Sequence, residues 1–234
     1  MSSGSKQVAL VVPAAGSGTR MGEEIPKPYL TVAGKTILEH TLLQFKQVDA
    51  IKELIVSTSE LFREQTREIA ATVFGDIKLT VIEGGAERQE SVLKALQYVS
   101  DSAELIAIHD AVRPFVSEQL ILDCINEVSA PGVDGAILAT PAKDTIKEVE
   151  NARYVVATPE RERMWQAQTP QIFKREVLLR AYNNATSRKH MGTDDSSLVE
   201  MIGGKVSVIK STADNFKITY PLDFQLAKLI LSGK

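Results

Sequence analysis

Cysteine is almost absent from this chain of 234 residues, since Cys124 is the only one. A single cysteine excludes a disulfide bond within the chain. The residues around it, LILDCINEV, are apolar at helical spacing. This pattern predicts a buried thiol in the core rather than a nucleophile.

An excess of positive charge is also missing. The chain has 27 Lys and Arg residues against 30 Asp and Glu residues, which gives a formal net charge of −3. Nucleic-acid-binding proteins usually carry a clear basic excess, so this balance argues against that class. An anionic ligand would instead have to be bound by cations that the fold brings together locally.

Long hydrophobic runs do not occur, and no apolar stretch approaches the ~20 residues of a membrane span. The N-terminal MSSGSK is short and polar, so we expect no secretory signal and, by default, a cytoplasmic protein. Hydrophobic residues make up 44% and charged residues 24%, as in ordinary globular proteins. The length favours a single domain over 1–234.

What the sequence does contain is an alternation of short apolar runs, typical of buried strands, with amphipathic runs of helical periodicity. We expect strands over 8–12, 53–58, 78–83, 105–110, 135–140 and 205–210, and helices over 36–48, 61–74, 87–99, 117–128, 174–185 and 221–231. Ser117 and Thr193 are expected to cap helices. The alternation predicts a Rossmann-like α/β fold, with a mostly parallel twisted sheet and helices on both faces. Such sheets bind ligands at the carboxyl ends of their strands.

A different pattern follows Thr140. The strings TIKEV and RYVVAT alternate apolar and polar residues on either side of Glu150-Asn151-Ala152, which is typical of a turn. This predicts a β-hairpin arm over about 141–166 that protrudes from the core. An isolated hairpin is only marginally stable in water, so we expect the arm to pack on a second subunit in a homodimer. Tyr154 and Trp165 are expected to lie in that interface.

The segment PAAGSGTRMGEEIPKPYL, residues 13–30, follows the first predicted strand. Its glycines and alanines let a ligand approach the backbone closely, and backbone N–H groups in such turns bind anions. A tight structural connection that needs small residues is the alternative. Two standard phosphate-binding motifs do not fit. Met21 occupies the third glycine position of G-x-G-x-x-G, and no G-x-x-x-x-G-K-[ST] string occurs.

Two cations, Arg20 and Lys27, accompany this loop. Most Lys and Arg side chains are solvated surface charges, but Lys27 lies between Pro26 and Pro28, which restrict the backbone around it. A rigidly held cation suits the stabilisation of charge in a transition state, because little reorganisation is needed. We therefore favour a phosphate-binding loop with two functional cations.

Six further strings occur in order along nearly the whole chain: GGAERQESV (84–92), HDAVRPF (109–115), PAKDTIKEV (141–149), PERERMWQAQTPQIF (159–173), GTDDSSLVE (192–200) and ADNFKIT (213–219). Together with the opening loop, they resemble the 2-C-methyl-D-erythritol 4-phosphate cytidylyltransferase family of nucleotidyltransferases, which acts in the non-mevalonate isoprenoid pathway. One departure is PKPYL, where the family more often has PKQ. It leaves Lys27 itself unchanged.

The resemblance implies transfer of CMP from CTP to 2-C-methyl-D-erythritol 4-phosphate, with Mg²⁺ bound mainly through the CTP phosphates. It implies catalytic roles for Arg20, Lys27 and Lys217. It also implies nucleotide contacts from Ala14, Ala15, Gly16, Ser17, Gly18, Gly85, Ser91, Asp110 and Ala111. Substrate contacts are implied for Asp110, Arg113, Thr145, Arg161, Thr169, Thr193 and Lys217, with Thr145 and Arg161 reaching the partner subunit's site.

Structural alternatives remain for several of these residues. Asp110 could cap a turn and Arg113 could form a salt bridge with it, while Ser91 could be an ordinary exposed helical serine. His109 is expected only as a strand-end residue facing the core or a neighbouring loop. The attacking phosphate oxygen is already ionised at neutral pH, so no strong base is required.

Two other functions also remain open. One is a cytidylyltransferase for another polyol phosphate, such as ribitol 5-phosphate, which product analysis with both acceptors would distinguish. The other is a non-catalytic nucleotide-binding regulatory protein. Release of pyrophosphate from CTP only in the presence of an acceptor would exclude it.

Overall fold

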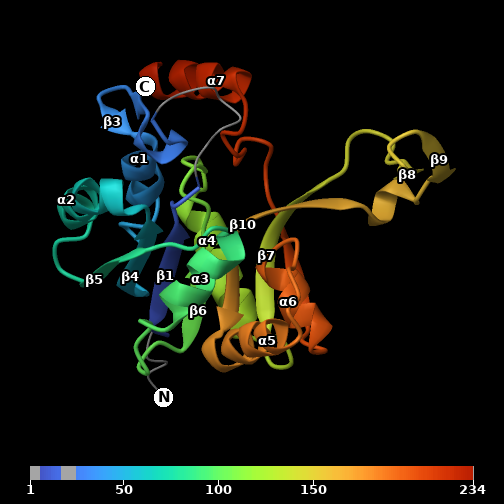
Figure 1. Ribbon diagram of the computed structural model, residues 1–234, viewed down its shortest axis with the longest axis horizontal. Coiled ribbons are helices and arrows are strands. Elements are labelled where there is room, and N and C mark those ends of the chain that lie inside the picture. The colour runs from blue at the N-terminus through green and yellow to red at the C-terminus, as the bar shows by residue number, and fades with distance from the viewer. Residues whose placement is uncertain (1–5, 17–24, 234) are drawn as a thin grey trace.

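The computed structural model describes residues 6–16 and 25–233, and a seven-stranded sheet lies at its centre (Figure 1). Across the sheet the strands are β11 (Val206–Lys210), β7 (Gly135–Pro141), β10 (Trp165–Lys174), β6 (Leu105–Ile108), β1 (Val8–Pro13), β4 (Ile51–Thr58) and β5 (Lys78–Glu83). Neighbouring strands pair in parallel except for β10, which is antiparallel to both β6 and β7. The predicted Rossmann-like, mostly parallel sheet is therefore confirmed.

Strand β10 is the one strand of this sheet that the sequence pattern did not predict. It contains Pro170, and a proline cannot donate a hydrogen bond to a sheet ladder. The pairing of β10 with β7 shifts register between Ala167 and Gln171, and the pairing with β6 begins only at Gln171. Pro170 thus lies in an unpaired part of the strand, where its missing N–H group interrupts no ladder.

The described part of the chain contains seven α-helices, of which the first six lie between strands and the last follows β11. They are α1 (Ile37–Leu43), α2 (Arg63–Val73), α3 (Arg88–Leu96), α4 (Glu118–Val128), α5 (Arg175–Ser187), α6 (Asp195–Met201) and α7 (Pro221–Ser232). Ser117 caps α4 as predicted, since its side chain accepts a hydrogen bond from the N–H of Leu120. The predicted cap at Thr193 is wrong. The Asp194 carboxylate caps α6 instead, and Ser197 completes a capping box with it.

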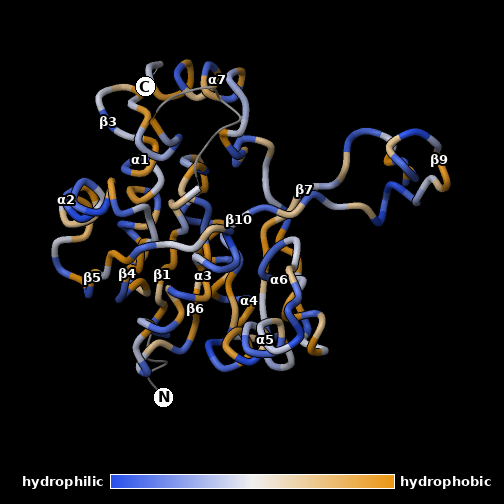
Figure 2. Tube along the Cα trace, viewed as in Figure 1, coloured by the Kyte–Doolittle hydropathy of each residue, from blue (hydrophilic) through white to orange (hydrophobic). Residues whose placement is uncertain are grey.

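The helices cover both faces of the sheet, as predicted. Alternate residues of β1 point to opposite sides, so Leu10 packs into a core with α1, α2 and α4, and Val11 into a core with α3, α5 and α6. The most hydrophobic stretches of the chain follow the central strands (Figure 2). Cys124 is fully buried in the first of these cores. Burial, with the nearby Asp123 and Glu127 charges, raises the pKa of its thiol to about 12.

The predicted arm comprises residues 142–164, between β7 and β10, and extends away from the sheet (Figure 1). Its base is closed by a hydrogen bond from the N–H of Ala142 to the carbonyl of Met164, at 2.9 Å. Farther out, β8 (Glu148–Glu150) pairs antiparallel with β9 (Tyr154–Ala157). The turn falls where it was predicted, with positive φ angles at Asn151 and Ala152.

A third, smaller core brings two distant segments to one edge of the sheet. Ile37, Ile218 and Ala227 pack together, which ties α7 and the segment before it to α1. The hairpin of β2 (Thr31–Val32) and β3 (Lys35–Thr36) and the short 3-10 helix η2 (Lys27–Tyr29) precede α1. Within residues 6–16 and 25–233, no helix is long and apolar enough to span a membrane.

Candidate active site

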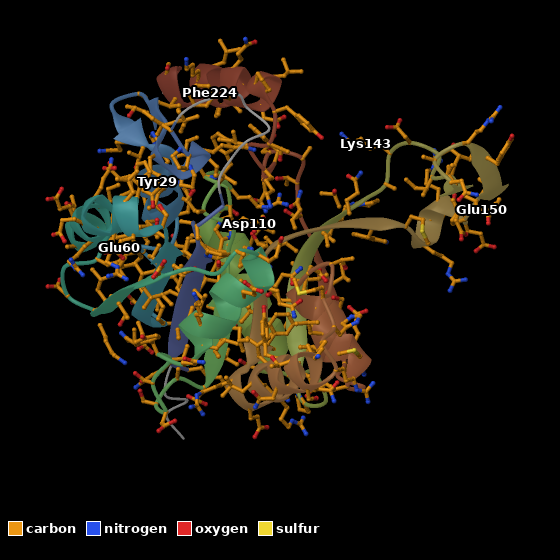
Figure 3. The ribbon with its side chains drawn as sticks, viewed as in Figure 1. Tyr29, Glu60, Asp110, Lys143, Glu150 and Phe224 are labelled. Carbon is orange, nitrogen blue, oxygen red and sulfur yellow. The ribbon has the colours of Figure 1, made fainter. Side chains whose placement is uncertain are left out.

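A cavity of about 420 Å³ lies at the carboxyl ends of β1, β5 and β6, the edge of the sheet that the fold predicts for a ligand. Figure 3 shows Asp110 in the middle of the molecule at this edge. The lining residues are Pro13, Ala14, Ala15, Gly16, Lys27, Pro28, Gly85, Ala86, Glu87, Arg88, Ser91, Asp110, Ala111, Val112 and Lys217.

The structure brings most of the predicted nucleotide-binding residues to this cavity. They are Ala14, Ala15, Gly16, Gly85, Ser91, Asp110 and Ala111. Of the predicted catalytic cations, Lys27 and Lys217 also line it. Ser17, Gly18 and Arg20 lie outside the described residues.

One wall of the cavity is the turn between β5 and α3, and side chains of α3 fix its backbone. The hydroxyl of Ser91 accepts a hydrogen bond from the N–H of Gly85 at 2.9 Å, and Lys94 Nζ donates to the carbonyl of Gly84 at 2.6 Å. Ser91 is only 2% exposed, so the alternative of an exposed helical serine is wrong. A Cβ at Gly84 would lie 2.3 Å from the Cβ of Ala15, so only glycine lets the two segments meet.

Lys27 lies on η2, and its side chain is largely buried. Its Nζ donates a hydrogen bond to the carbonyl of Thr219 at 2.7 Å. This contact links η2 to the segment that follows Lys217, so the two lysines are held at one cavity by a short stretch of backbone. The arrangement fixes the position of the Lys27 ammonium before any ligand binds.

Asp110 is the centre of the charged part of the cavity. Its Oδ1 accepts from Arg88 Nε at 3.1 Å, and its Oδ2 from Arg113 Nε at 3.2 Å and Lys217 Nζ at 3.0 Å. Burial disfavours the charged carboxylate, but the positive charges of Arg88, Lys217 and Arg113 outweigh it and hold the pKa of Asp110 well below its usual range. Asp110 is therefore ionised, and it orders cations at the cavity.

A layer of polar groups behind Asp110 holds it in place. The Thr169 hydroxyl accepts from the N–H of Asp110 at 3.0 Å and lies 3.1 Å from His109 Nδ1, while His109 Nε2 lies 3.0 Å from the Arg113 carbonyl. The Arg113 carbonyl can only accept, so Nε2–H of His109 donates to it, and Nδ1 of the neutral ring then accepts from the Thr169 hydroxyl. Burial lowers the pKa of His109 to about 4, which keeps the imidazole neutral.

Comparison with known proteins decides the family. The family model described as 2-C-methyl-D-erythritol 4-phosphate cytidylyltransferase matches residues 8–233. The chain belongs to this family. It is 43% identical over 230 residues to the enzyme of that name from Geotalea uraniireducens (strain Rf4), with 97% of each chain covered. It is 37% identical over 225 residues to the one from Caldanaerobacter subterraneus, covering 96% of this chain and 98% of the relative.

Solved structures give the same result. The crystal structure of 4-diphosphocytidyl-2C-methyl-D-erythritol synthase from Anaerococcus prevotii superimposes with a TM-score of 0.86 at 31% identity, covering 97% of each chain. The cytidylyltransferase from Thermus thermophilus gives a TM-score of 0.77, also at 31% identity, covering 97% of this chain and 99% of that one. The seven-stranded sheet and the cavity at its edge are therefore those of a member of the cytidylyltransferase family.

The substrate-binding residues implied by the resemblance are distributed over several parts of the structure. Asp110 and Lys217 line the cavity, while Arg113 and Thr169 are buried directly behind it. Thr193 lines a second cavity of about 180 Å³ on the far side of Arg88. Thr145 and Arg161 are exposed on the arm. Figure 3 shows Lys143 and Glu150 of the same arm far from Asp110.

Arg88 is a site residue that the sequence analysis missed. It is the first residue of α3 and contacts two buried carboxylates, those of Asp110 and Asp195. Burial opposes the charge of its guanidinium, but the carboxylates of Asp195 and Asp110 outweigh burial and raise the pKa of Arg88. In GGAERQESV the arginine occupies an ordinary polar position, and nothing in the spacing relates it to Asp195, which lies 107 positions away. Only the fold brings these residues together.

Proposed function

We propose that this chain transfers CMP from CTP to 2-C-methyl-D-erythritol 4-phosphate, giving 4-diphosphocytidyl-2-C-methyl-D-erythritol and pyrophosphate. Family membership supports the reaction. The observation that carries it for this chain is one cavity lined both by a nearly side-chain-free backbone stretch, Ala14 to Gly16, and by Lys27 and Lys217. A triphosphate needs such a combination of close backbone approach and fixed positive charge.

The chemistry requires positioning and charge stabilisation rather than a protein nucleophile. The 4-phosphate of the acceptor is ionised at neutral pH, so one of its oxygens attacks the α-phosphorus of CTP in line and pyrophosphate leaves. Lys27, Lys217 and Arg20 stabilise the negative charge that builds up at the phosphorus. His109 takes no proton, since its ring is neutral, buried and hydrogen-bonded on both nitrogens.

We expect the cytosine base to be recognised by the backbone of Ala14 to Gly16 and of the turn at Gly84 and Gly85. A cytosine ring offers an amino donor, a carbonyl acceptor and a ring-nitrogen acceptor along one edge. Backbone carbonyl and N–H groups can match that edge. The N–H of Gly85 is already bonded to Ser91, so its role is to orient the turn rather than to bind the ring.

Magnesium fits this site as a partner of the nucleotide. Hard cations prefer oxygen ligands, and Mg²⁺ is commonly bound through substrate phosphates and few carboxylates. The carboxylates lining the cavity are Glu87 and Asp110, and Asp110 is bonded to three cations. Among residues 6–16 and 25–233 there is no cluster of three or more potential metal-binding side chains. The triphosphate oxygens would therefore supply most ligands, and the ion would neutralise their charge.

The arm supports a homodimer in which each subunit completes the site of the other. Val149, Tyr154, Val155 and Val156 are each about half exposed, and hydrophobic colour appears at β9 far from the core (Figure 2). Apolar side chains gathered on a protruding hairpin are typical of a protein interface. Burying them on a partner would bring Thr145 and Arg161 to the acceptor phosphate in that partner's cavity.

A matrix of nucleotides against acceptors, with Mg²⁺ present, tests the proposed reaction. We expect pyrophosphate release with CTP and 2-C-methyl-D-erythritol 4-phosphate together, and none with CTP alone. Chelation of the metal should abolish it. Equal turnover with ribitol 5-phosphate would contradict the proposed acceptor, and tight CTP binding without turnover with any acceptor would point to a regulatory protein.

A further inference from the structure

A series of polar side chains runs from the exposed Lys217 at the cavity, through the partly buried Arg88, to Asp195 and Tyr182 in the interior. Tyr182 OH donates to Asp195 Oδ1 at 2.5 Å, and Arg88 Nη2 donates to Asp195 Oδ2 at 2.8 Å. Arg88 Nε then contacts Asp110 Oδ1, and Lys217 contacts the other oxygen of Asp110. Five separate parts of the fold, α5, α6, α3, the end of β6 and the segment before α7, are joined in this way.

Asp195 has no evident structural reason to be buried. Its side chain is 0% exposed, yet the neighbouring Asp194 caps α6. Burying a carboxylate costs free energy that an ion pair only partly offsets, so apolar residues of similar size would often be equally stable. Buried ion pairs are better explained by the geometry that they impose. The geometry imposed here is that of Arg88.

The side chain of Arg88 is suited to holding two carboxylates in a fixed arrangement. Its guanidinium is planar, and it uses Nε for Asp110 and Nη2 for Asp195, so the two carboxylates fix its orientation. Held in this way, Arg88 fixes one oxygen of Asp110, and the other oxygen contacts both Arg113 and Lys217 at the cavity. Without the Arg88 contact, Asp110 Oδ1 would lose its salt bridge, and the remaining contacts, from Arg113 and Lys217, would both be to Oδ2.

We propose that Arg88, oriented by Asp195 and Tyr182, is a positioning residue that fixes the Asp110 carboxylate and, through it, the Lys217 ammonium for nucleotidyl transfer. The inference rests on the proposed function. Asp195 and Tyr182 line the second cavity and not the first, and Asp195 is linked to Asp110 through Arg88. The prediction is therefore an effect on catalysis from two residues that do not line the cavity holding Asp110 and Lys217.

A double-mutant cycle between Asp195→Asn and Lys217→Ala tests this inference. Asp195→Asn keeps the shape of the side chain and removes its charge, and we expect kcat/KM for the acceptor to fall roughly ten-fold. In the Lys217→Ala background the same change should cost less than about two-fold, because the group through which it acts is already gone. The stoichiometry of CTP binding should stay at that of the wild type.

Tyr182→Phe provides a second variant that removes only one hydroxyl, and we expect a smaller loss with the same dependence on Lys217. The matched control is Glu53→Gln. Glu53 is also a buried carboxylate, bonded to Ser100 and Lys78, but it does not line the cavity. Its replacement should lower stability and leave kcat/KM unchanged.

Additive losses in the cycle, or an unchanged kcat/KM for both Asp195→Asn and Tyr182→Phe, would overturn the positioning role alone. A wild-type chain with no turnover would overturn the proposed function as well. These outcomes are distinguishable, since the first requires an active wild type.

Discussion

The cavity and the arm differ in how their functional side chains are held. At the cavity, Lys27 is bonded to the Thr219 carbonyl and Lys217 to Asp110, so contacts within one chain set their positions. On the arm, Thr145 and Arg161 are exposed, and the nearby hydrophobic residues are about half exposed. One chain is thus enough to order the charges of the cavity, whereas the arm has a surface suited to a partner.

The largest effect is expected at the cavity itself. Replacing Lys27 by Ala removes a charge stabiliser whose position is fixed in advance, so turnover should fall roughly 10²–10³-fold, about 3–4 kcal/mol. Steady-state kinetics with both substrates saturating would measure it. Lys35→Ala is the matched control, since Lys35 is a solvent-exposed lysine paired with Glu39 on the same segment.

Lys27→Met keeps most of the length of the side chain, so it separates loss of charge from loss of packing. We expect it to be about as impaired as the alanine variant while retaining more stability. Near-normal turnover in a folded Lys27→Met protein would show that the ammonium is not needed.

The arm gives the next largest effect, and mixing subunits shows where it acts. Arg161→Ala and Lys27→Ala homodimers should each be nearly inactive. In a mixed dimer, an arm acting across the interface leaves one site with both residues intact. Equal mixing should therefore restore about a quarter of the wild-type activity, assuming random association of the subunits.

A control mixes each variant with itself under the same exchange conditions, where no recovery is expected. If the arm served the cavity of its own chain, every site in the mixed dimer would lack one residue. Failure to recover activity at any mixing ratio would then show that the arm does not act in the cavity of a partner subunit.

Features that depend on neighbouring residues could be predicted from the sequence, whereas those that depend on long-range contacts could not. Local patterns were sufficient for the six parallel strands, the turn at Asn151 and Ala152, and the placement of Lys27 at the sheet edge. These features depend on neighbours in the sequence. Strand β10 was not predicted, because Pro170 interrupts the sequence pattern that is typical of a strand. Its place between β6 and β7 also depends on long-range pairing.

Arg88 and Asp195 were not predicted for the same reason, since long-range contacts bring them to the site. Arg88 contacts Asp110 and Asp195 only in the folded chain, and no periodicity links these three positions in the sequence. Threonine is a good capping residue, which favours Thr193 in the sequence, but the carboxylate of Asp194 caps α6. Contacts made by the fold cannot be inferred from one sequence without relatives.

Acid should affect the core behind the cavity more than the arm. His109 has a folded-state pKa of about 4 because it is buried. The unfolded chain, in which His109 has the ordinary pKa of about 6.5, therefore binds a proton more readily than the folded chain. The contribution of His109 to the free energy of unfolding is full above pH 6.5 and is lost as the pH falls, because the unfolded chain takes up the proton. We expect the free energy of unfolding to drop by about 2 kcal/mol between pH 7 and pH 5 through His109 alone.

Urea unfolding at several pH values would measure this slope, with His109→Gln as the comparison variant. The variant should be less stable at neutral pH but should lose less stability on acidification. Asp110 does not interfere, because its lowered pKa gives stability that is lost only below its ordinary value of about 4. An identical slope in both proteins would show that His109 is not the group responsible.

The smallest effect is expected in the backbone wall of the cavity. Ser91→Ala leaves the N–H of Gly85 without its acceptor, and a hydrogen bond of this kind contributes about 0.5–1.5 kcal/mol. Because Ser91 orients the turn and contributes no charge, KM for CTP should rise roughly 2–10-fold with little change in kcat. Arm variants such as Arg161→Ala should instead affect the acceptor and leave KM for CTP unchanged. A Ser91→Ala enzyme that loses kcat rather than nucleotide affinity would show that this wall takes part in the chemical step, and the division between nucleotide wall and acceptor arm would no longer hold.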